Sequence, residues 1–176
     1  VGDFTRDGVP DVLVGQRVTV ANAVEIYSVD GNTGTFLSTA SSNFGNANAG
    51  SFIVGDFDNS GTQDYIITIS GGANNVNYNN SPGVGDPDFG VVSSGISMEY
   101  GKTADFDGNG FLDIAYFLGG QLQVRPGDGT GDFSGAGYNA SDNSGRMAIG
   151  DVNGDGRPDI MTVGNLGTRK IYIYDG

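Results

Sequence analysis

Short apolar runs alternate with polar, glycine-rich turns along the whole chain. In Val24-Glu25-Ile26, and again in Ile171-Tyr172-Ile173, every second side chain is aliphatic, which is the period of a β-strand with one buried face. Other runs, such as Tyr65-Ile66-Ile67, consist of strand-forming residues without interruption. No stretch stands out as an amphipathic helix, and no apolar run approaches the length of a membrane span. The pattern predicts an all-β protein that does not insert into a membrane.

One polar loop recurs four times, each time directly before an apolar run. Every copy has an oxygen-bearing side chain at positions 1, 3, 5 and 9 and a glycine at position 6. The copies begin at residues 3, 56, 105 and 151, so they are 53, 49 and 46 residues apart. Such a period is typical of propeller blades, each of which is a four-stranded antiparallel sheet. We therefore expect one β-propeller-like domain over residues 1–176 with about four blades, as a compact ring or as part of a larger propeller. The expected repeats span approximately 1–50, 51–98, 99–145 and 146–176, the last one incomplete.

The spacing of oxygen side chains in this loop favours a calcium site. Oxygen ligands suit a hard cation, and a glycine at position 6 permits the sharp turn that wraps the loop around it. An EF-hand would need an acidic ligand at position 12, where this chain has Val14, Ile67, Tyr116 and Thr162. The sequence thus predicts up to four Ca²⁺ ions in loops between strands. With position 7 included, the candidate ligands are Asp3, Thr5, Asp7, Val9 and Asp11; Asp56, Asp58, Ser60, Thr62 and Asp64; Asp105, Asp107, Asn109, Phe111 and Asp113; and Asp151, Asn153, Asp155, Arg157 and Asp159.

The four sites are not expected to be equal. The first loop has Thr5 at position 3 and the cationic Arg6 beside it, so we expect the weakest site there. Asp113 is expected to serve as a bidentate ligand, as is the corresponding Asp159. On that reasoning their replacement should destabilise the protein more than replacement of Asp11.

Composition narrows the range of functions. The net charge is −13, and the loops hold 12 of the 21 acidic residues, so the acidity belongs mainly to the proposed metal sites. The eight Lys and Arg residues are scattered, which gives no support to nucleic-acid binding. The chain has no Cys and no His, hence no thiol nucleophile and no imidazole base. Since weak calcium sites fill best where calcium is millimolar, we expect an extracellular or cell-surface protein.

The loops and a second recurring turn resemble a known family. Gly55-Asp56-Phe57, with the loop that it opens, and the downstream turn Asp128-Gly129-Thr130-Gly131-Asp132-Phe133 are similar to FG-GAP/VCBS repeats. The resemblance covers essentially the whole chain and implies a β-propeller with calcium at the blade loops. It says little about function, because such propellers serve in adhesion, sugar binding, scaffolding and as accessory domains of enzymes.

Nothing in the sequence indicates catalysis. Carboxylates inside the loops are accounted for as ligands, and nothing marks Glu25 and Glu99 as a glycosidase pair. The insertion at 71–95 is rich in Asn and Tyr, which can bind sugars, but such a segment is more often a polar surface loop. Asn139-Ala140-Ser141 matches the acceptor pattern for N-glycosylation.

Three functional hypotheses remain open at this stage. The first is a non-catalytic, calcium-stabilised extracellular binding or adhesion module with a glycan or protein ligand. The second is a structural repeat that assembles into a fibre or surface layer, and the third is an accessory domain of a polysaccharide-degrading enzyme. The first blade lacks most of its opening strand and the last its closing strand, which leaves sheet edges open. We therefore expect pairing with a neighbouring copy or with further sequence of the same polypeptide.

Overall fold

Antiparallel β-sheets make up the regular structure of the protein. The computed structural model describes residues 1–18, 23–43, 49–69, 75–80, 89–93, 98, 100–140, 146–163 and 171–174, and these residues contain strands and turns but no helix. The strands are β1 (Val12–Val18), β2 (Ala23–Val29), β3 (Phe36–Asn43), β4 (Ala49–Gly55), β5 (Asp64–Ile69), β6 (Asn75–Asn79), β7 (Phe89–Ser93), β8 (Tyr100–Ala104), β9 (Asp113–Leu118), β10 (Gln121–Arg125), β11 (Tyr138–Ala140), β12 (Met147–Gly150), β13 (Asp159–Val163) and β14 (Ile171–Tyr174).

Neighbouring strands in the sequence pair with each other to form four sheets. Sheet 1 has the order β1-β2-β3, sheet 2 β4-β5-β6-β7, sheet 3 β8-β9-β10-β11 and sheet 4 β12-β13-β14, all antiparallel. Before β1, the residues preceding the first loop contribute a single bridge between Gly2 and Asp11. Sheets 2 and 3 therefore have four strands each, while three strands each of sheets 1 and 4 are described.

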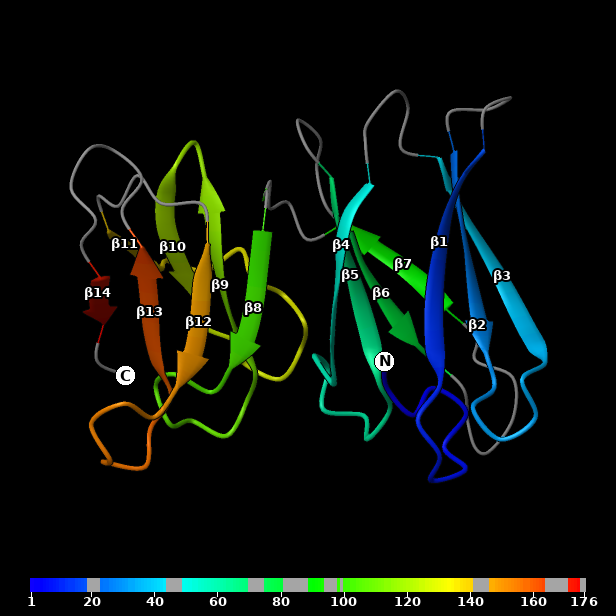
Figure 1. Ribbon diagram of the computed structural model, residues 1–176, viewed down its shortest axis with the longest axis horizontal. Coiled ribbons are helices and arrows are strands. Elements are labelled where there is room, and N and C mark those ends of the chain that lie inside the picture. The colour runs from blue at the N-terminus through cyan, green and yellow to red at the C-terminus, as the bar shows by residue number, and fades with distance from the viewer. Residues whose placement is uncertain are drawn as a thin grey trace.

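Successive sheets pack face to face in the order of the sequence, so that sheets 2 and 3 are covered on both faces (Figure 1). This arrangement explains the unbroken apolar runs. In β9 the five residues from Asp113 to Phe117 are all buried, and Tyr65, Ile66 and Ile67 of β5 are buried as well. Side chains of these strands that point to opposite faces therefore enter the clusters on either side of the sheet.

Three apolar clusters hold neighbouring sheets together. Tyr65 and Ile67 pack with Leu13 of β1 between sheets 1 and 2. Ile66 and Ile114 belong to the cluster between sheets 2 and 3, and Phe117 with Ile160 to the cluster between sheets 3 and 4. The core is thus a series of interfaces between sheets, as expected for blade-like repeats.

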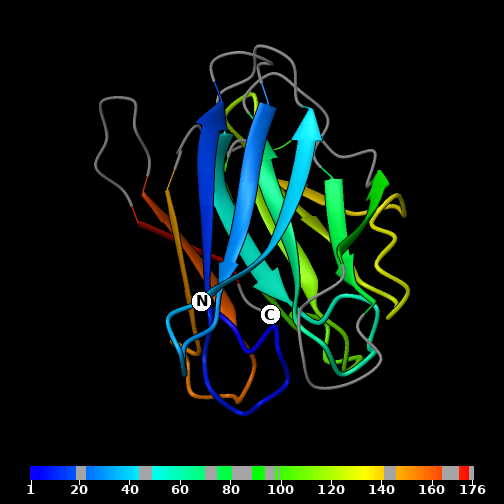
Figure 2. The same ribbon diagram turned by 90° about the vertical axis from the view of Figure 1, so that its right-hand side faces the viewer.

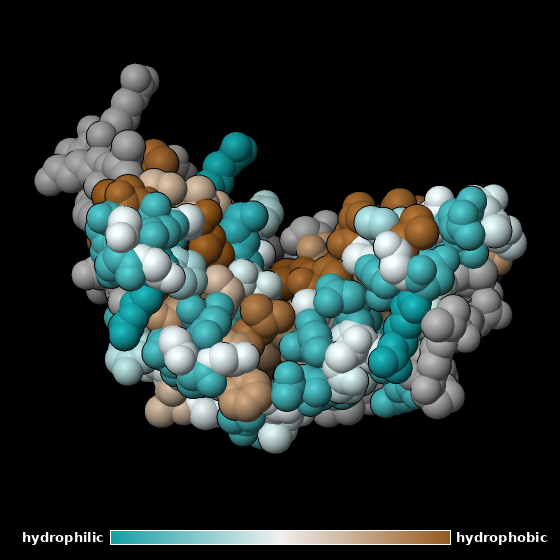
Figure 3. Space-filling view, turned by 90° about the horizontal axis from the view of Figure 1, so that it is seen from below, coloured by the Kyte–Doolittle hydropathy of each residue, from teal (hydrophilic) through white to brown (hydrophobic). Residues whose placement is uncertain are grey.

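The described sheets form an open arc. No described sheet closes on itself, and sheet 1 and sheet 4 lie at opposite ends of the molecule in Figure 1. Figure 2 looks at the end that sheet 1 forms, and the space-filling view in Figure 3 shows an outline that is hollowed between two lobes. The prediction of an all-β fold is confirmed; the closure into a ring and the number of blades stay predictions. Among the described residues, no helix is long and apolar enough to cross a membrane.

Candidate metal centres

The four repeated loops lie on one side of the molecule, at the lower end in Figure 1. Loop 1 (residues 3–11) leads into β1, and loop 2 (56–64) joins β4 to β5. Loop 3 (105–113) joins β8 to β9, and loop 4 (151–159) joins β12 to β13. The repeat in the sequence is therefore also a repeat in space, because each loop occupies the same place relative to its sheet.

The backbone of the four loops has the same two left-handed residues. Positions 4 and 6 both have positive φ, a conformation that glycine adopts without steric cost. The angles at position 6 are 86° for Gly8, 82° for Gly61, 90° for Gly110 and 89° for Gly156. At position 4 they are 61° for Arg6, 56° for Asn59, 75° for Gly108 and 82° for Gly154. The turn that the position-6 glycine was expected to permit is thus present in all four loops.

Replacing Arg6 by glycine is expected to stabilise the protein. A non-glycine residue with left-handed φ costs about 1–2 kcal/mol, although the greater freedom of glycine in the unfolded chain offsets part of this. We expect Arg6→Gly to raise the free energy of unfolding by roughly 0.5–1 kcal/mol, as measured by urea unfolding of the metal-free protein. Asn59→Gly is the matched control and should gain less, since asparagine tolerates this conformation better. A loss of stability in Arg6→Gly would contradict the strain argument.

The aspartate at position 1 closes each loop on itself. Asp56 accepts hydrogen bonds from the backbone N–H groups of Ser60 (2.9 Å) and Gly61 (2.9 Å). Asp3 does the same with Asp7 (3.2 Å) and Gly8 (3.0 Å). In loops 3 and 4 the position-6 N–H donates to position 1 at 2.9 Å in each case. These contacts bring the position-1 carboxylate over the turn.

The aspartate at position 9 is buried in all four loops and binds backbone groups. Asp113 accepts hydrogen bonds from the N–H groups of Phe106 (2.7 Å) and Asp107 (3.3 Å) through Oδ2, and from that of Gly127 (2.7 Å) through Oδ1. It therefore ties the start of its own loop to the end of the third strand of its sheet.

The same hydrogen bonds recur in the other repeats. Asp11 accepts from Phe4 (2.8 Å), Thr5 (2.9 Å) and Gly31 (3.0 Å). Asp64 accepts from the N–H groups of Phe57 and Asn79, both at 2.9 Å, and Asp159 from that of Val152 at 2.8 Å. Sequence reasoning treated position 9 as a metal ligand only, because an aspartate that binds backbone and one that binds an ion look alike in a sequence.

In loops 2 and 3 the carboxylates also approach one another. Oxygens of Asp56, Asp58 and Asp64 lie within 4.8 Å of one another, and so do those of Asp105, Asp107 and Asp113. Burial, together with the charges of Asp58 and Asp56, raises the pKa of Asp64 to about 7 despite its backbone hydrogen bonds. Burial likewise raises the pKa of Asp113, to which Asp107 adds repulsion. A cation between such groups would offset both costs.

The donor set of the loops fits a hard cation. Asp105 Oδ1 is buried and has no hydrogen-bond partner. The hydroxyl oxygen of Thr5, at position 3 of loop 1, is also buried without a hydrogen-bond partner. Buried polar oxygens without a partner are costly in a folded protein, and a bound ion would satisfy them. Both atoms belong to positions that the sequence predicts as ligands, so the fit rests on this structure as well as on the motif.

Positions 3, 5 and 7 line the turn of each loop. Oxygens of Asp58, Asp107 and Asn153 accept the N–H group two residues on, at 3.0, 3.0 and 2.8 Å. At position 5, Asp7, Asn109 and Asp155 do the same, each at 2.8 Å. Ser60 Oγ and Thr62 Oγ1 are 2.6 Å apart. The side chains of Val9, Phe111 and Arg157 carry no oxygen, so in loops 1, 3 and 4 position 7 could serve an ion only through its carbonyl group.

Other residues considered from the sequence are placed as follows. The stretch 71–95, expected as a polar surface loop, instead contributes strands β6 and β7 to sheet 2, and its other residues lie almost entirely outside the described ones. Glu99 and the side chain of Glu25 also lie outside the described residues. Asn139 is exposed on β11, where a glycan could be attached.

An all-β chain of successive antiparallel sheets, each with an Asx- and Gly-rich loop before a buried strand, defines a class of repeat protein. A family model for the FG-GAP-like repeat matches residues 3–67 and 105–162, well over half of the chain. The chain therefore belongs to the FG-GAP-like repeat family. Its repeats suggest an adhesion-type or structural module, are generally non-catalytic, and are typical of extracellular or surface proteins. No curated protein was found to match the chain.

Proposed function

We propose that the protein is a non-catalytic, calcium-stabilised extracellular module for binding or adhesion. The observation that carries this proposal is loop 3, where a buried, unpartnered Asp105 Oδ1 belongs to the same group of carboxylates as Asp107 and Asp113. In this group three carboxylates lie close together and one buried oxygen has no hydrogen-bond donor, a combination that a divalent cation would relieve.

Calcium would stabilise the folded structure of this protein. Each loop joins two strands or leads into one, so an ion that binds the loop also fixes the strands. Asp105 and Asp107, with Asn109 and the Phe111 carbonyl, would hold an ion in loop 3, and corresponding residues would hold one in the other loops. Binding to the native state alone stabilises a protein by mass action.

The ligand of the module would be a glycan or a protein. The support is the family, whose repeats suggest adhesion-type or structural modules, and the position of all four loops on one side, which leaves other faces of the sheets for contact. The structural alternative, assembly into a fibre or surface layer, is favoured by exposed apolar side chains at both ends of the arc, Phe36 in sheet 1 and Ile173 in sheet 4.

Calcium titration of the metal-free protein tests the proposal. Isothermal calorimetry should show binding at more than one site, and Asp105→Asn should remove one of them. Asp128→Asn is the matched control, because Asp128 is an exposed carboxylate outside the loops. Glycan-array binding that depends on calcium would support the binding module. Absence of calcium binding at millimolar concentration would refute the calcium part of the proposal.

The metal-free protein is expected to be less stable at pH 8 than at pH 5. The folded pKa of Asp64, about 7, is raised above its ordinary 3.8, so this group's contribution to stability is full below pH 3.8 and is lost as the pH rises through about 7. Added calcium binds the ionised form, so its stabilising effect should be larger at pH 8. Urea unfolding at both pH values, with and without calcium, measures this.

General charge repulsion would give a pH dependence of the same sign, and salt separates the two causes. Surface repulsion is screened at about 0.5 M NaCl, whereas the cost of ionising a buried carboxyl is much less affected. The difference between pH 5 and pH 8 should therefore persist in high salt. A metal-free protein that is more stable at pH 8 would contradict the expectation.

A further inference from the structure

Two of the interfaces between sheets contain a pair of phenylalanine rings. Phe4 of loop 1 meets Phe89 of sheet 2 edge to face, with ring centroids 5.9 Å apart. Phe57 of loop 2 meets Phe133 of sheet 3 in the same way, at 5.8 Å. Such pairs stabilise a fold beyond the area that they bury. In both pairs a loop phenylalanine of one sheet binds a ring from the next sheet, and this second ring begins the fourth strand or shortly precedes it.

The ring of Phe133 fills a socket between sheets 2 and 3. It is 1% exposed and belongs to one cluster with Phe57, Tyr78 and Ile114. The turn before the ring is closely packed, since a Cβ at Gly131 would collide with the Tyr78 ring. After Phe133 the chain soon enters β11, which pairs with β10. One segment of the chain therefore supplies both the ring that fills the interface and the outermost strand of the sheet.

The interface between sheets 3 and 4 has the same socket, but there the space is a cavity. The residues that form the socket have counterparts at the same places of the next repeat: Phe106 for Phe57, Pro126 for Tyr78 and Ile160 for Ile114. All three counterparts line a cavity of about 500 Å³, a volume within the usual range of ligand sites. Ile160 packs sheet 4 on sheet 3 as Ile114 packs sheet 3 on sheet 2. The cavity is thus the space that remains when two sheets are packed and no ring is inserted between them.

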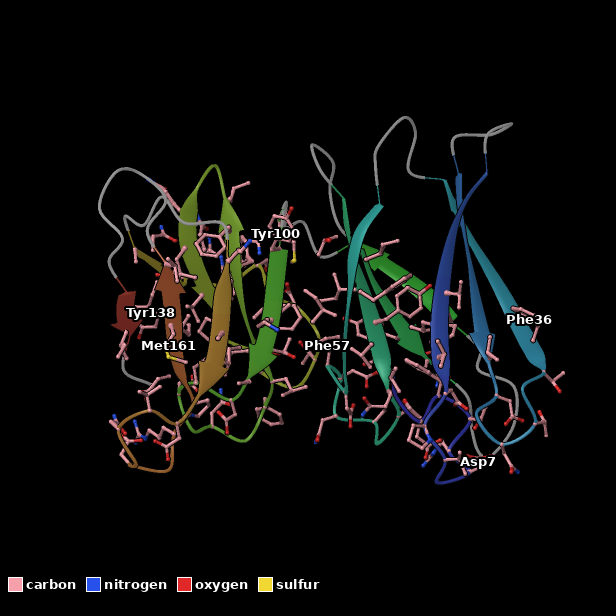
Figure 4. All side chains as sticks on the ribbon, viewed as in Figure 1. Asp7, Phe36, Phe57, Tyr100, Tyr138 and Met161 are labelled. Carbon is pink, nitrogen blue, oxygen red and sulfur yellow. The ribbon has the colours of Figure 1, made fainter. Side chains whose placement is uncertain are left out.

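Sheet 4 also has a strand edge at the place of the fourth strand. β14 pairs with β13, and among the described residues no strand pairs with the other edge of β14. In sheets 2 and 3 the corresponding strands, β6 and β10, pair on that side with β7 and β11. Figure 4 shows Tyr138, which lines the cavity, at the end of the molecule where β14 lies. Because Phe133 and β11 follow one another in sheet 3, a single segment of the same kind could reach both the cavity and the edge of β14.

We propose that sheets 3 and 4 bind a peptide segment of a partner protein that consists of a glycine-rich turn, a phenylalanine and a short β-strand. The ring enters the cavity beside Phe106, and the strand adds to β14, so that main-chain hydrogen bonds give affinity and the ring gives specificity. The chain's own Phe89 and Phe133 already fill their interfaces, and Phe36 lies at the opposite end of the molecule, so the ring comes from a partner (Figure 4). This inference rests on the proposed binding function and specifies its ligand as a protein segment.

Titration of the full chain with a labelled synthetic peptide tests the proposal. The probe has the sequence of residues 128–140, which contains the turn, the ring and the strand of sheet 3. Fluorescence anisotropy should show saturable binding, and a peptide with Phe133→Ala should bind at least about tenfold more weakly, as expected for the loss of one buried aromatic ring. Because this change is made in the peptide, the fold of the protein is not affected. Equal binding of the two peptides, or no binding at millimolar concentration, would overturn the proposal.

A variant of the protein locates the binding site in the cavity. Ala140 lines the cavity, so Ala140→Phe places a ring there and should abolish peptide binding. Leu118→Phe is the matched control, because Leu118 is also an apolar residue of sheet 3 but is 40% exposed and does not line the cavity. Melting curves show whether both variants are folded. A folded Ala140→Phe variant that binds the peptide as before would contradict the proposed site.

Hydrogen exchange tests the addition of a strand. The bound peptide should slow exchange of the backbone N–H groups of residues 171–174, which form β14, and leave those of β1 unchanged. Binding without slower exchange in β14 would overturn the proposed strand addition. All measurements are made with calcium present. A protein that binds calcium but not the peptide would contradict only this inference, and one that binds the peptide but not calcium would contradict only the calcium part of the proposed function.

Discussion

Removal of calcium is expected to lower the melting temperature by well over about ten degrees. Each loop holds three aspartates, whose mutual repulsion is relieved only when an ion is bound. An ion at a hundredfold excess over its dissociation constant stabilises the native state by about 2.7 kcal/mol per site. In a domain of this size each kcal/mol corresponds to roughly 2–4 °C, so the loss of even two sites exceeds ten degrees. Scanning calorimetry with and without excess chelator measures the shift.

Re-addition of calcium should restore the melting curve, whereas magnesium should restore it only in part. Magnesium demands stricter octahedral geometry and gives up its water less readily. If the curve is the same with and without chelator, the loops do not bind calcium in a way that matters for the fold, and their aspartates serve only as hydrogen-bond acceptors.

The local form of the loops could be predicted from the sequence because it depends on nearby residues. Gly8, Gly61, Gly110 and Gly156 recur at one position of the loop, and each has the positive φ that this position requires. The apolar run after each loop likewise predicted a strand, and β1, β5, β9 and β13 begin where the loops end. Period-2 alternation and uninterrupted apolar runs were sufficient for the fold class.

The contacts between sheets were not predicted, although their signal was present. Phe57 of the recurring Gly-Asp-Phe and Phe133 of the second recurring turn meet edge to face between sheets 2 and 3, with ring centroids 5.8 Å apart, and both residues could have been noted in the sequence. Which loop meets which turn depends on how sheets stack, and no local pattern fixes that. Closure of the arc into a ring could not be predicted for the same reason, since it depends on the surfaces at the two ends of the arc.

The role of the position-9 aspartates needed the structure as well. From the sequence, Asp11 was expected to matter less than Asp113, because loop 1 offers the poorer set of ligands. The hydrogen bonds give a reason to revise that ranking. Asp11 and Asp113 each accept three backbone N–H groups, and both are essentially inaccessible to solvent.

Asp11→Ala is therefore expected to destabilise the metal-free protein about as strongly as Asp113→Ala. Either substitution leaves buried backbone N–H groups without an acceptor, at a cost of about 1–3 kcal/mol for each group that water cannot reach. Two of the three donors are buried in each case, so we expect a loss of roughly 3–5 kcal/mol in the free energy of unfolding. Asp128→Ala, which removes an exposed turn carboxylate, should cost less than about 1 kcal/mol. Urea unfolding in metal-free buffer gives the three values.

Metal-free conditions are what make the comparison decisive. If the position-9 carboxylates were ligands alone, their removal without calcium would relieve repulsion and leave stability unchanged or slightly higher. If they bind the backbone as the structure shows, the variant loses stability before any ion is added. Added calcium then increases the difference from the unsubstituted protein only in a loop whose remaining ligands can no longer hold the ion. Asp113 has Asp105 and Asp107 close by, so the calcium-dependent part of the loss should be larger for Asp113→Ala than for Asp11→Ala, while the metal-free part should be alike.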